Sequence, residues 1–150
     1  MITRVLAIAM IVFAAGSAAC DEQLADVAGP TPNLAPTFSS IQRDIFQSTD
    51  AAGRSSCASC HHPSGGAFRQ VSLDFTSDAV YNALVGVSSV QRPGVLRVAP
   101  GDPDNSYLLH KIEGRPGILG LRMPRNGPPY LTDGQIQIIR RWIEIGAPRN

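Results

Sequence analysis

The chain has 150 residues, a nearly balanced charge (13 Lys and Arg against 12 Asp and Glu) and 43% hydrophobic residues. This length suits one domain of ordinary size with a short extension. The balanced charge is not typical of a protein that binds nucleic acid, because such proteins carry an excess of Lys and Arg. We therefore expect no nucleic acid among its partners.

The first residues have the pattern of a targeting segment. An apolar run over residues 5–15 follows Arg4 and is followed by the small residues GSAAC. A basic start, an apolar stretch of this length and a small-residue cleavage site predict a secretory signal over residues 1–19. The run is too short for a permanent transmembrane helix. The pattern predicts export to the periplasm or elsewhere outside the cytoplasmic membrane.

Two fates are open for Cys20. The segment Ser17-Ala18-Ala19-Cys20 resembles a bacterial lipoprotein box, in which the cysteine is lipidated and becomes the new N-terminus. Ser17 departs from that pattern, which usually has Leu or another aliphatic residue there. Ordinary secretory cleavage would instead leave Cys20 as a free thiol. We favour lipidation and membrane attachment, because Cys20 is otherwise an unpaired cysteine in an exported chain.

Residues 20–36 contain three prolines and no periodic apolar pattern, which predicts a flexible tether. The folded domain is then expected over residues 37–150. Its first helix is predicted by apolar residues spaced at i, i+3, i+7 and i+8: Phe38, Ile41, Ile45 and Phe46. A second helix is predicted over residues 78–85, with Thr76 or Ser77 as its cap.

Two further helices have clear start and stop signals. Asp102-Pro103 predicts the start of a third helix, which should end at Gly114. In the last helix, Thr132 and Gln135 have the spacing of a capping box, and Gly146 marks its end. The inward face of this helix is predicted to hold Ile136, Ile139, Trp142 and Ile143.

Gly- and Pro-rich loops separate these helices, and only residues 94–99 have an extended pattern. The fold class is therefore predicted as all-α, with about four helices. Long loops in such a domain need something to pack against. A bound haem would serve that purpose.

The segment Cys57-Ala58-Ser59-Cys60-His61 carries the most specific chemistry in the sequence. Two thiols separated by two residues can add across the two vinyl groups of one haem. The adjacent histidine is then held against the iron as an axial ligand. The motif predicts one covalently attached haem c, bound by Cys57 and Cys60 and ligated by His61.

Three other interpretations of this motif were weighed. A structural disulfide would not need His61. A thioredoxin-like pair requires a βαβ context, which the pattern lacks. A zinc site formed by Cys57, Cys60 and a neighbouring histidine would need further ligands, and His110 is the only other candidate in the folded domain. Export and a helical, loop-rich domain favour haem.

A second axial ligand has three candidates. Met1 and Met10 leave with the signal, so Met123 is the only methionine of the mature chain. His62 is next to the proximal ligand, which makes the opposite face of a haem hard to reach, and His110 lies on a predicted helix. The choice matters because a thioether ligand raises the reduction potential relative to a second imidazole.

From about Ile41 to Asn150 the chain resembles the cytochrome c superfamily, in particular bacterial single-haem domains often attached to larger proteins in planctomycetes and related organisms. The segments that carry the resemblance are CASCHHPSGG, LDFTSDAVYNAL, VAPGDPDNSYLLHKI and RMPRNGPPYLTDGQIQIIRRWIEIGAP. The resemblance implies that Met123 is the distal ligand and that the first and last helices cross near the haem. Two departures are a polar insert over residues 49–56 and Pro124-Arg125, where many relatives have Pro-Pro.

Several other residues have two interpretations each. Trp142 could donate to a haem propionate, but its place on the apolar face favours the core. Arg122 and Arg125 could pair with propionates or be solvated. For Arg140 and Arg141 we expect the solvated face of the last helix.

The predicted function is transfer of single electrons by one haem, to and from transiently bound redox proteins. Two fixed axial ligands leave no open position on the iron, so we do not expect an enzyme. The alternative is a haem enzyme or ligand sensor in which the bond from Met123 to the iron is labile.

Overall fold

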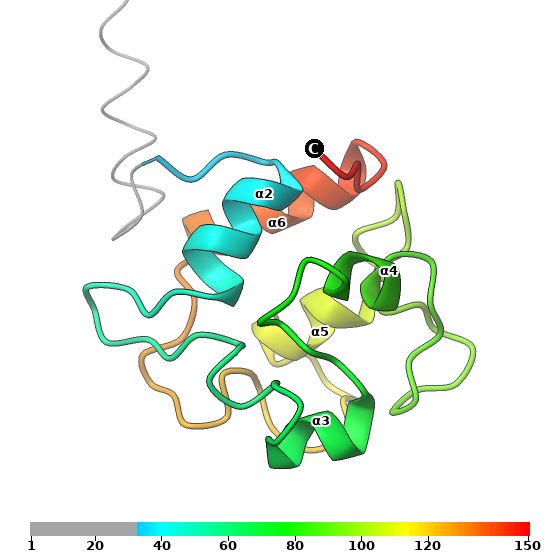
Figure 1. The fold of residues 1–150 in the computed structure, drawn as a ribbon. Coiled ribbons are helices and arrows are strands. Elements are labelled where there is room, and N and C mark those ends of the chain that lie inside the picture. The colour runs from blue at the N-terminus through cyan, green and yellow to red at the C-terminus, as the bar shows by residue number, and fades with distance from the viewer. Residues whose placement is uncertain (1–32) are drawn as a thin grey trace, which may run out of the picture.

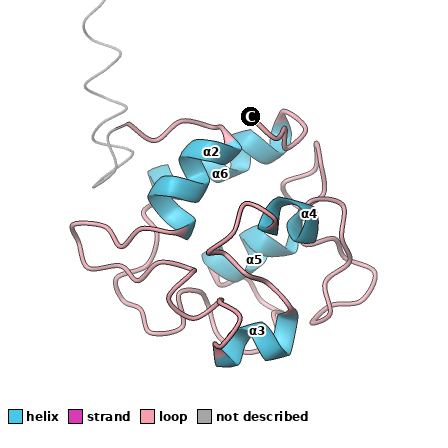
Figure 2. Ribbon diagram, in the orientation of Figure 1, coloured by secondary structure: helices cyan, strands magenta, loops and turns pink. Residues whose placement is uncertain are grey.

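A computed structural model describes residues 33–150, drawn in colour in Figure 1. The predicted signal peptide, Cys20 and most of the predicted tether lie outside the described residues. The described part of the chain contains helices joined by long loops and no β-strand (Figure 2). The all-α class is therefore confirmed. No helix within residues 33–150 has the length and apolarity needed to span a membrane.

The first helical segment forms as predicted. Helix α2 (Phe38–Ile41) continues directly into the π-helical turn η1 (Gln42–Phe46). The backbone N–H of Ser40 donates to Oγ1 of Thr37 at 3.2 Å and caps the start of α2. Leu34, which lies before the expected start of the domain at residue 37, is buried in the hydrophobic core.

Helix α6 (Asp133–Glu144) has the predicted capping box. The N–H of Gln135 donates to Oγ1 of Thr132 at 3.2 Å, and the N–H of Thr132 donates to Oε1 of Gln135 at 3.0 Å. The helix ends just before Gly146, whose φ of +100° favours glycine. Both signals act within a few residues, so the sequence was sufficient to locate both ends of this helix.

Helices α2 and α6 pack side by side (Figure 1). Trp142 of α6 is fully buried, and its ring centroid lies 5.9 Å from that of Phe38. Its indole N–H donates to the carbonyl oxygen of Pro148 at 2.9 Å. The preferred interpretation of Trp142 as a core residue is confirmed, and its single donor is already used.

Helix α5 (Tyr107–Glu113) begins later than predicted. Asp102 caps only a turn, in which its Oδ1 accepts from the N–H of Asn105 at 3.1 Å. Ser106 then has an extended backbone (φ −92°, ψ 115°), which separates this turn from the helix. The predicted end at Gly114 is correct, because this residue adopts the left-handed conformation with φ +73°.

The remaining short elements were predicted only in part. Helix α4 (Val80–Leu84) is shorter than the predicted helix over residues 78–85. Residues 94–99 make only isolated bridges, Val85 to Val98 and Ser88 to Leu96. Helix α3 (Gly66–Val71) was not predicted. None of its residues is buried, and its sequence does not have the apolar periodicity that indicates a helix.

The hydrophobic core lies between α2, η1, α4, α5 and α6. Its fully or almost fully buried side chains include Ile41, Ile45, Phe46, Val80, Leu84, Leu109, Ile139, Trp142 and Ile143. Helix α3 stands apart from this core and faces α5 across the lower half of the molecule (Figure 1). The loops between these helices surround the candidate site.

Candidate functional site

A cavity of about 470 Å³ lies between the segment after η1, helices α3 and α5, and the loop before α6. This volume falls within the range of about 300–1,000 Å³ that is usual for cofactor pockets. All four predicted site residues, Cys57, Cys60, His61 and Met123, line it. The structure thus brings Met123 to the same cavity as the motif, although a long stretch of sequence separates them.

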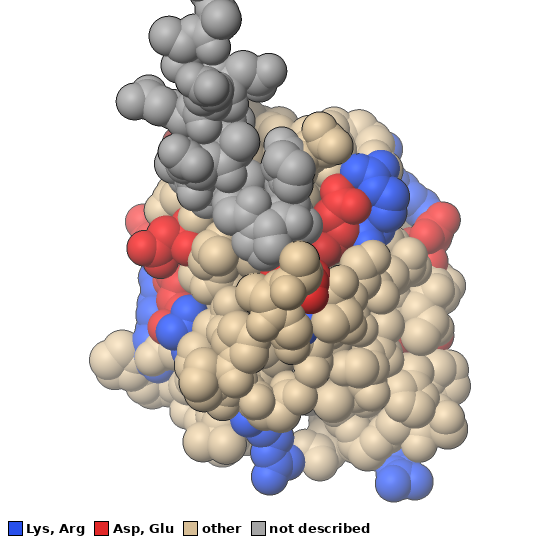
Figure 3. Space-filling view, turned by 90° about the vertical axis from the view of Figure 1, so that its left-hand side faces the viewer, with Lys and Arg blue, Asp and Glu red and all other residues tan. Residues whose placement is uncertain are grey.

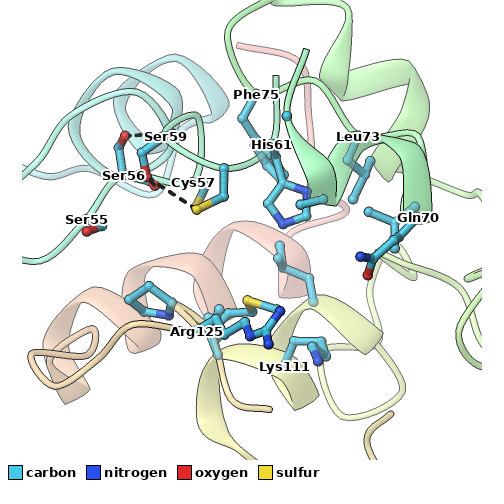
Figure 4. A pocket seen from close by; sticks show the side chains of 18 of the residues that line it. Ser55, Ser56, Cys57, Ser59, His61, Gln70, Leu73, Phe75, Lys111 and Arg125 are labelled. Atoms are coloured by element: carbon cyan, nitrogen blue, oxygen red, sulfur yellow. Dashed lines mark hydrogen bonds between the residues drawn. The ribbon is translucent and has the colours of Figure 1, made fainter. Parts of the chain in front are cut away.

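The motif forms a tight turn that is bonded to the last residue of η1. The N–H of Ala58 donates to the carbonyl oxygen of Phe46 at 2.9 Å, which fixes the turn to η1. The N–H of His61 donates to the carbonyl oxygen of Cys57, also at 2.9 Å. This turn directs the side chains of Cys57 and His61 into the same cavity (Figure 4).

The two cysteines are not joined in a disulfide. Burial raises the pKa of the Cys57 thiol to about 11, although the charge of Arg54 acts in the opposite direction. A reactive redox thiol needs a lowered pKa. This environment, and the absence of strands from residues 33–150, disfavour a thioredoxin-like pair.

A zinc site is disfavoured as well. Within residues 33–150, no group of three or more His, Cys, Asp or Glu side chains is placed to hold a metal ion. His110, the one further candidate ligand, does not line the cavity, and its Nε2 lies 2.7 Å from the carbonyl oxygen of Asp104. A structural zinc ion needs four such ligands.

His61 packs against the aromatic ring of Phe75. The N–H of Phe75 donates to the carbonyl oxygen of His61 at 2.9 Å, and the two ring centroids lie 5.5 Å apart. Burial, with a smaller contribution from the charge of Lys111, lowers the pKa of His61 and favours the neutral imidazole. Neutral imidazole is the form that binds metals.

The imidazole of His61 also has an unsatisfied polar atom. Its Nδ1 is buried without a hydrogen-bond partner. Buried polar atoms without partners are rare, because they have lost their hydrogen bonds to water without replacement. A metal bound at Nδ1 itself would offset this cost, whereas one bound at Nε2 would not. The neutral ring and its place in the cavity fit His61 to the role of a metal ligand.

Met123 belongs to the other side of the cavity. Its N–H donates to the carbonyl oxygen of Lys111 on α5 at 2.8 Å. Figure 4 shows Lys111 and Arg125 across the cavity from His61 and Cys57. His62, by contrast, lines the cavity next to His61, and its Nδ1 lies 3.1 Å from Oγ of Ser64. Of the three candidates for the second ligand, His110 does not line the cavity and His62 lies beside His61, whereas Met123 lines the cavity from a segment bonded to Lys111.

The cavity is lined by cationic side chains and by no acidic ones among the described residues. The four cations are Arg54, Arg97, Lys111 and Arg125. Most of the remaining lining is apolar, including Val71, Leu73, Phe75, Leu108, Ile112 and Leu131. An apolar cofactor that carries carboxylates, such as haem with its two propionates, fits this combination.

The two arginines that flank the Met123 loop have different surroundings. Arg125 lines the cavity. Arg122 does not; its Nε donates to the carbonyl oxygen of Ile112 at 2.7 Å, and its guanidinium stacks over the ring of Tyr130 at 4.2 Å. Of these two residues, only Arg125 is in a position to pair with a propionate.

The polar insert over residues 49–56 contains a residue whose importance the sequence did not reveal. Arg54 is fully buried and donates from Nε to Oδ2 of Asp50 at 3.0 Å. Its guanidinium also donates to four backbone carbonyl oxygens, those of Asp44, Ile45, Ser48 and Ser55. The insert is therefore a folded structure that supports the start of the motif. A single arginine in a polar run gives no sign of such burial.

Two more buried cations were missed for the same reason. Arg97 donates to the carbonyl oxygens of Val71 at 2.6 Å and Ala83 at 2.7 Å. Lys111 donates to those of Leu119 at 2.8 Å and Leu121 at 2.7 Å. Burial lowers the pKa of both groups. Their partners are backbone atoms of other segments of the chain, which sequence periodicity does not identify.

The prediction for the two arginines of α6 was half correct. Arg141 is exposed and pairs with Glu144 at 2.7 Å, as expected of a solvated face. Arg140 instead bridges Asp104 at 2.9 Å and Glu113 at 3.0 Å, and so links α6 to α5. On the face shown in Figure 3, acidic and basic side chains lie next to one another and form no large patch of one sign.

No family model matches this chain, and the comparisons with curated proteins and with solved structures also give no match. The chemistry of the site therefore has to be inferred from the residues that line it.

Proposed function

We propose that this protein is a single-haem c-type cytochrome that carries single electrons. Cys57 and Cys60 would hold the haem through two thioether bonds, and His61 and Met123 would ligate its iron. One observation carries the proposal: a CxxCH turn and the only methionine after the predicted signal line a single cavity of cofactor size, which is apolar and cationic.

When bound, the haem would supply a one-electron Fe(II)/Fe(III) couple. The chain's own residues have three tasks. His61 and Met123 would ligate the iron, so that little rearrangement would accompany the change of charge. The apolar lining would exclude water, which together with a thioether ligand favours a raised reduction potential. Arg97, Lys111 and Arg125, which line the cavity, would offset the charge of the propionates.

The firm attachment of the Met123 loop supports a carrier over the alternative of a haem enzyme or ligand sensor. Those functions need an open or labile position on the iron. The N–H of Met123 is bonded to Lys111, and the preceding residues are bonded to α5 by further hydrogen bonds. A methionine held in this way favours a closed coordination sphere.

Partners are proposed to be redox proteins that dock transiently near an exposed haem edge. Cys60 is exposed, whereas Cys57 is half-buried. The haem edge attached to Cys60 would then be the one nearest to solvent and the natural point of electron exchange. Such encounters use small, weak interfaces. The predicted signal, with Cys20 lipidated or free, favours a place outside the cytoplasmic membrane.

The experiment is expression with a cytochrome c maturation system, followed by haem staining of the denatured protein. The wild type and a Cys20→Ser control should both retain haem through denaturation, whereas Cys57→Ser combined with Cys60→Ser should not. Optical spectra of the oxidised and reduced protein would test Met123 through the weak long-wavelength sulfur-to-iron band. A wild-type protein without attached pigment would refute the proposal.

A further inference from the structure

Lys111 occupies an unusual place in this protein. It is the only lysine in the sequence, and its side chain is buried, with 8% of the residue exposed. It lines the cavity from α5. Its side chain donates to the loop that leads to Met123, and its carbonyl oxygen accepts from Met123 itself.

Three hydrogen bonds connect Lys111 to this loop. The ammonium donates to the carbonyl oxygens of Leu119 at 2.8 Å and Leu121 at 2.7 Å. The carbonyl oxygen of Lys111 accepts from the N–H of Met123 at 2.8 Å. One residue thus holds the loop at three points, the last of which is the proposed ligand itself.

The stability of the fold alone does not account for a lysine at this position. Lys111 is buried, and within residues 33–150 its ammonium forms no ion pair with a carboxylate. A buried cation that is compensated only by neutral carbonyls is costly, and an apolar side chain of similar length would pack there at lower cost. What the ammonium provides is a directional link to two carbonyls, which an apolar side chain does not.

We propose that Lys111 is a positioning residue that holds the Met123 loop so that the thioether faces His61. This inference rests on the proposed function. The ammonium fixes the two carbonyls that precede Met123, while the backbone of Lys111 fixes Met123 directly. These bonds hold the loop, and with it the sulfur of Met123, against the rigid helix α5.

Other contacts make a partial effect the expected one. The hydroxyl of Tyr107 accepts from the N–H of Leu119 at 3.0 Å, and Nε of Arg122 donates to the carbonyl oxygen of Ile112 at 2.7 Å. Both remain when the ammonium of Lys111 is removed, and so does the backbone bond from the N–H of Met123 to the carbonyl oxygen of Lys111. The loop should therefore stay near α5, with Met123 held less tightly than in the wild type.

The test compares Lys111→Leu, which is apolar and brings no second sulfur into the cavity, with Lys111→Arg, which restores two donors. Lys111→Leu should keep covalent haem but show a weaker sulfur-to-iron band. Carbon monoxide should bind its reduced form at least about tenfold faster, since a charge-assisted hydrogen bond contributes a factor of about ten or more. Lys111→Arg should restore most of the band and slow the binding.

The outcomes separate this inference from the proposed function. A wild-type band and wild-type carbon monoxide binding in Lys111→Leu would overturn the positioning role while leaving the cytochrome intact. Absence of attached haem from the wild type would overturn the function itself. If Lys111→Leu fails to fold, the polar variant Lys111→Gln decides: a weakened band supports the role, and an unchanged band overturns it.

Discussion

The guanidinium of Arg54 and the carboxylate of Asp50 form an ion pair of 3.0 Å, and both side chains are almost completely buried (0% and 2% exposed). Gln135, at the start of α6, donates from Nε2 to the same carboxylate oxygen at 3.4 Å. The pair therefore connects the insert before the motif with the last helix. It holds in place the chain segment from which Cys57 and His61 extend.

Removing one partner of this pair should destabilise the protein strongly. Asp50→Asn leaves the Arg54 guanidinium buried without a counter-charge, and breaking such a pair costs about 3–5 kcal/mol. Denaturant unfolding of the haem-loaded protein would measure the loss. Arg43→Met is the matched control, because Arg43 pairs with Asp44 at the surface, and no measurable change is expected. Similar stabilities of the two variants would contradict the role of the buried pair.

The same pair predicts an acid dependence. Burial pushes the pKa of Asp50 up, but hydrogen bonds from the Arg54 backbone, Gln135 and the Arg54 side chain outweigh it, and the net pKa is lowered. A lowered folded-state pKa gives stability that is present above the unfolded pKa of about 3.9 and is lost as pH falls through the folded value. The difference in unfolding free energy between wild type and Asp50→Asn should thus shrink below about pH 4. A constant difference down to pH 2 would refute this.

Met123→Ala should separate attachment of the haem from its coordination. The two thioether bonds and His61 remain, so the denatured variant should still stain for haem. The sulfur-to-iron band should vanish and the reduction potential should fall, because the thioether favours the reduced iron. Potentiometric titration with optical detection would measure both. His110→Gln is the control, since His110 lies outside the cavity, and its band should be unchanged. A band that survives in Met123→Ala would remove Met123 from the site.

The helices that could be predicted are those with local signals and a buried stripe. Helix α6 has both a capping box and an apolar face, and its bounds followed from the sequence. Helix α3 has neither, since its residues line a cavity instead of a core. The start of α5 was misplaced because Asp102-Pro103 opens a turn just as well as a helix.

The residues of the site also differ in whether nearby sequence or contacts with other segments determine their roles. Cys57, Cys60 and His61 belong to one short motif, so their spacing alone was enough to predict a site for haem attachment. The roles of Arg54, Lys111 and Arg97 depend on backbone carbonyls that the fold brings to them from other segments. An isolated charged residue in a sequence predicts a surface position, because most are solvated. Only the three-dimensional structure shows that these three are exceptions.

If the proposed haem is bound, the chain should depend on it for cooperative folding. Cys57→Ala combined with Cys60→Ala would then leave the cavity of about 470 Å³ without a covalently held occupant. In a small domain this removes a large share of the buried apolar contacts, because side chains such as Phe75, Leu108 and Leu131 would lose the group they pack against. We expect a broad thermal transition and binding of a hydrophobic dye, as in compact states without fixed packing. Cys60→Ala alone, with one thioether bond left, should still unfold cooperatively. A sharp transition without dye binding in the double variant would show that the protein chain builds its own core and that the cavity is not completed by haem.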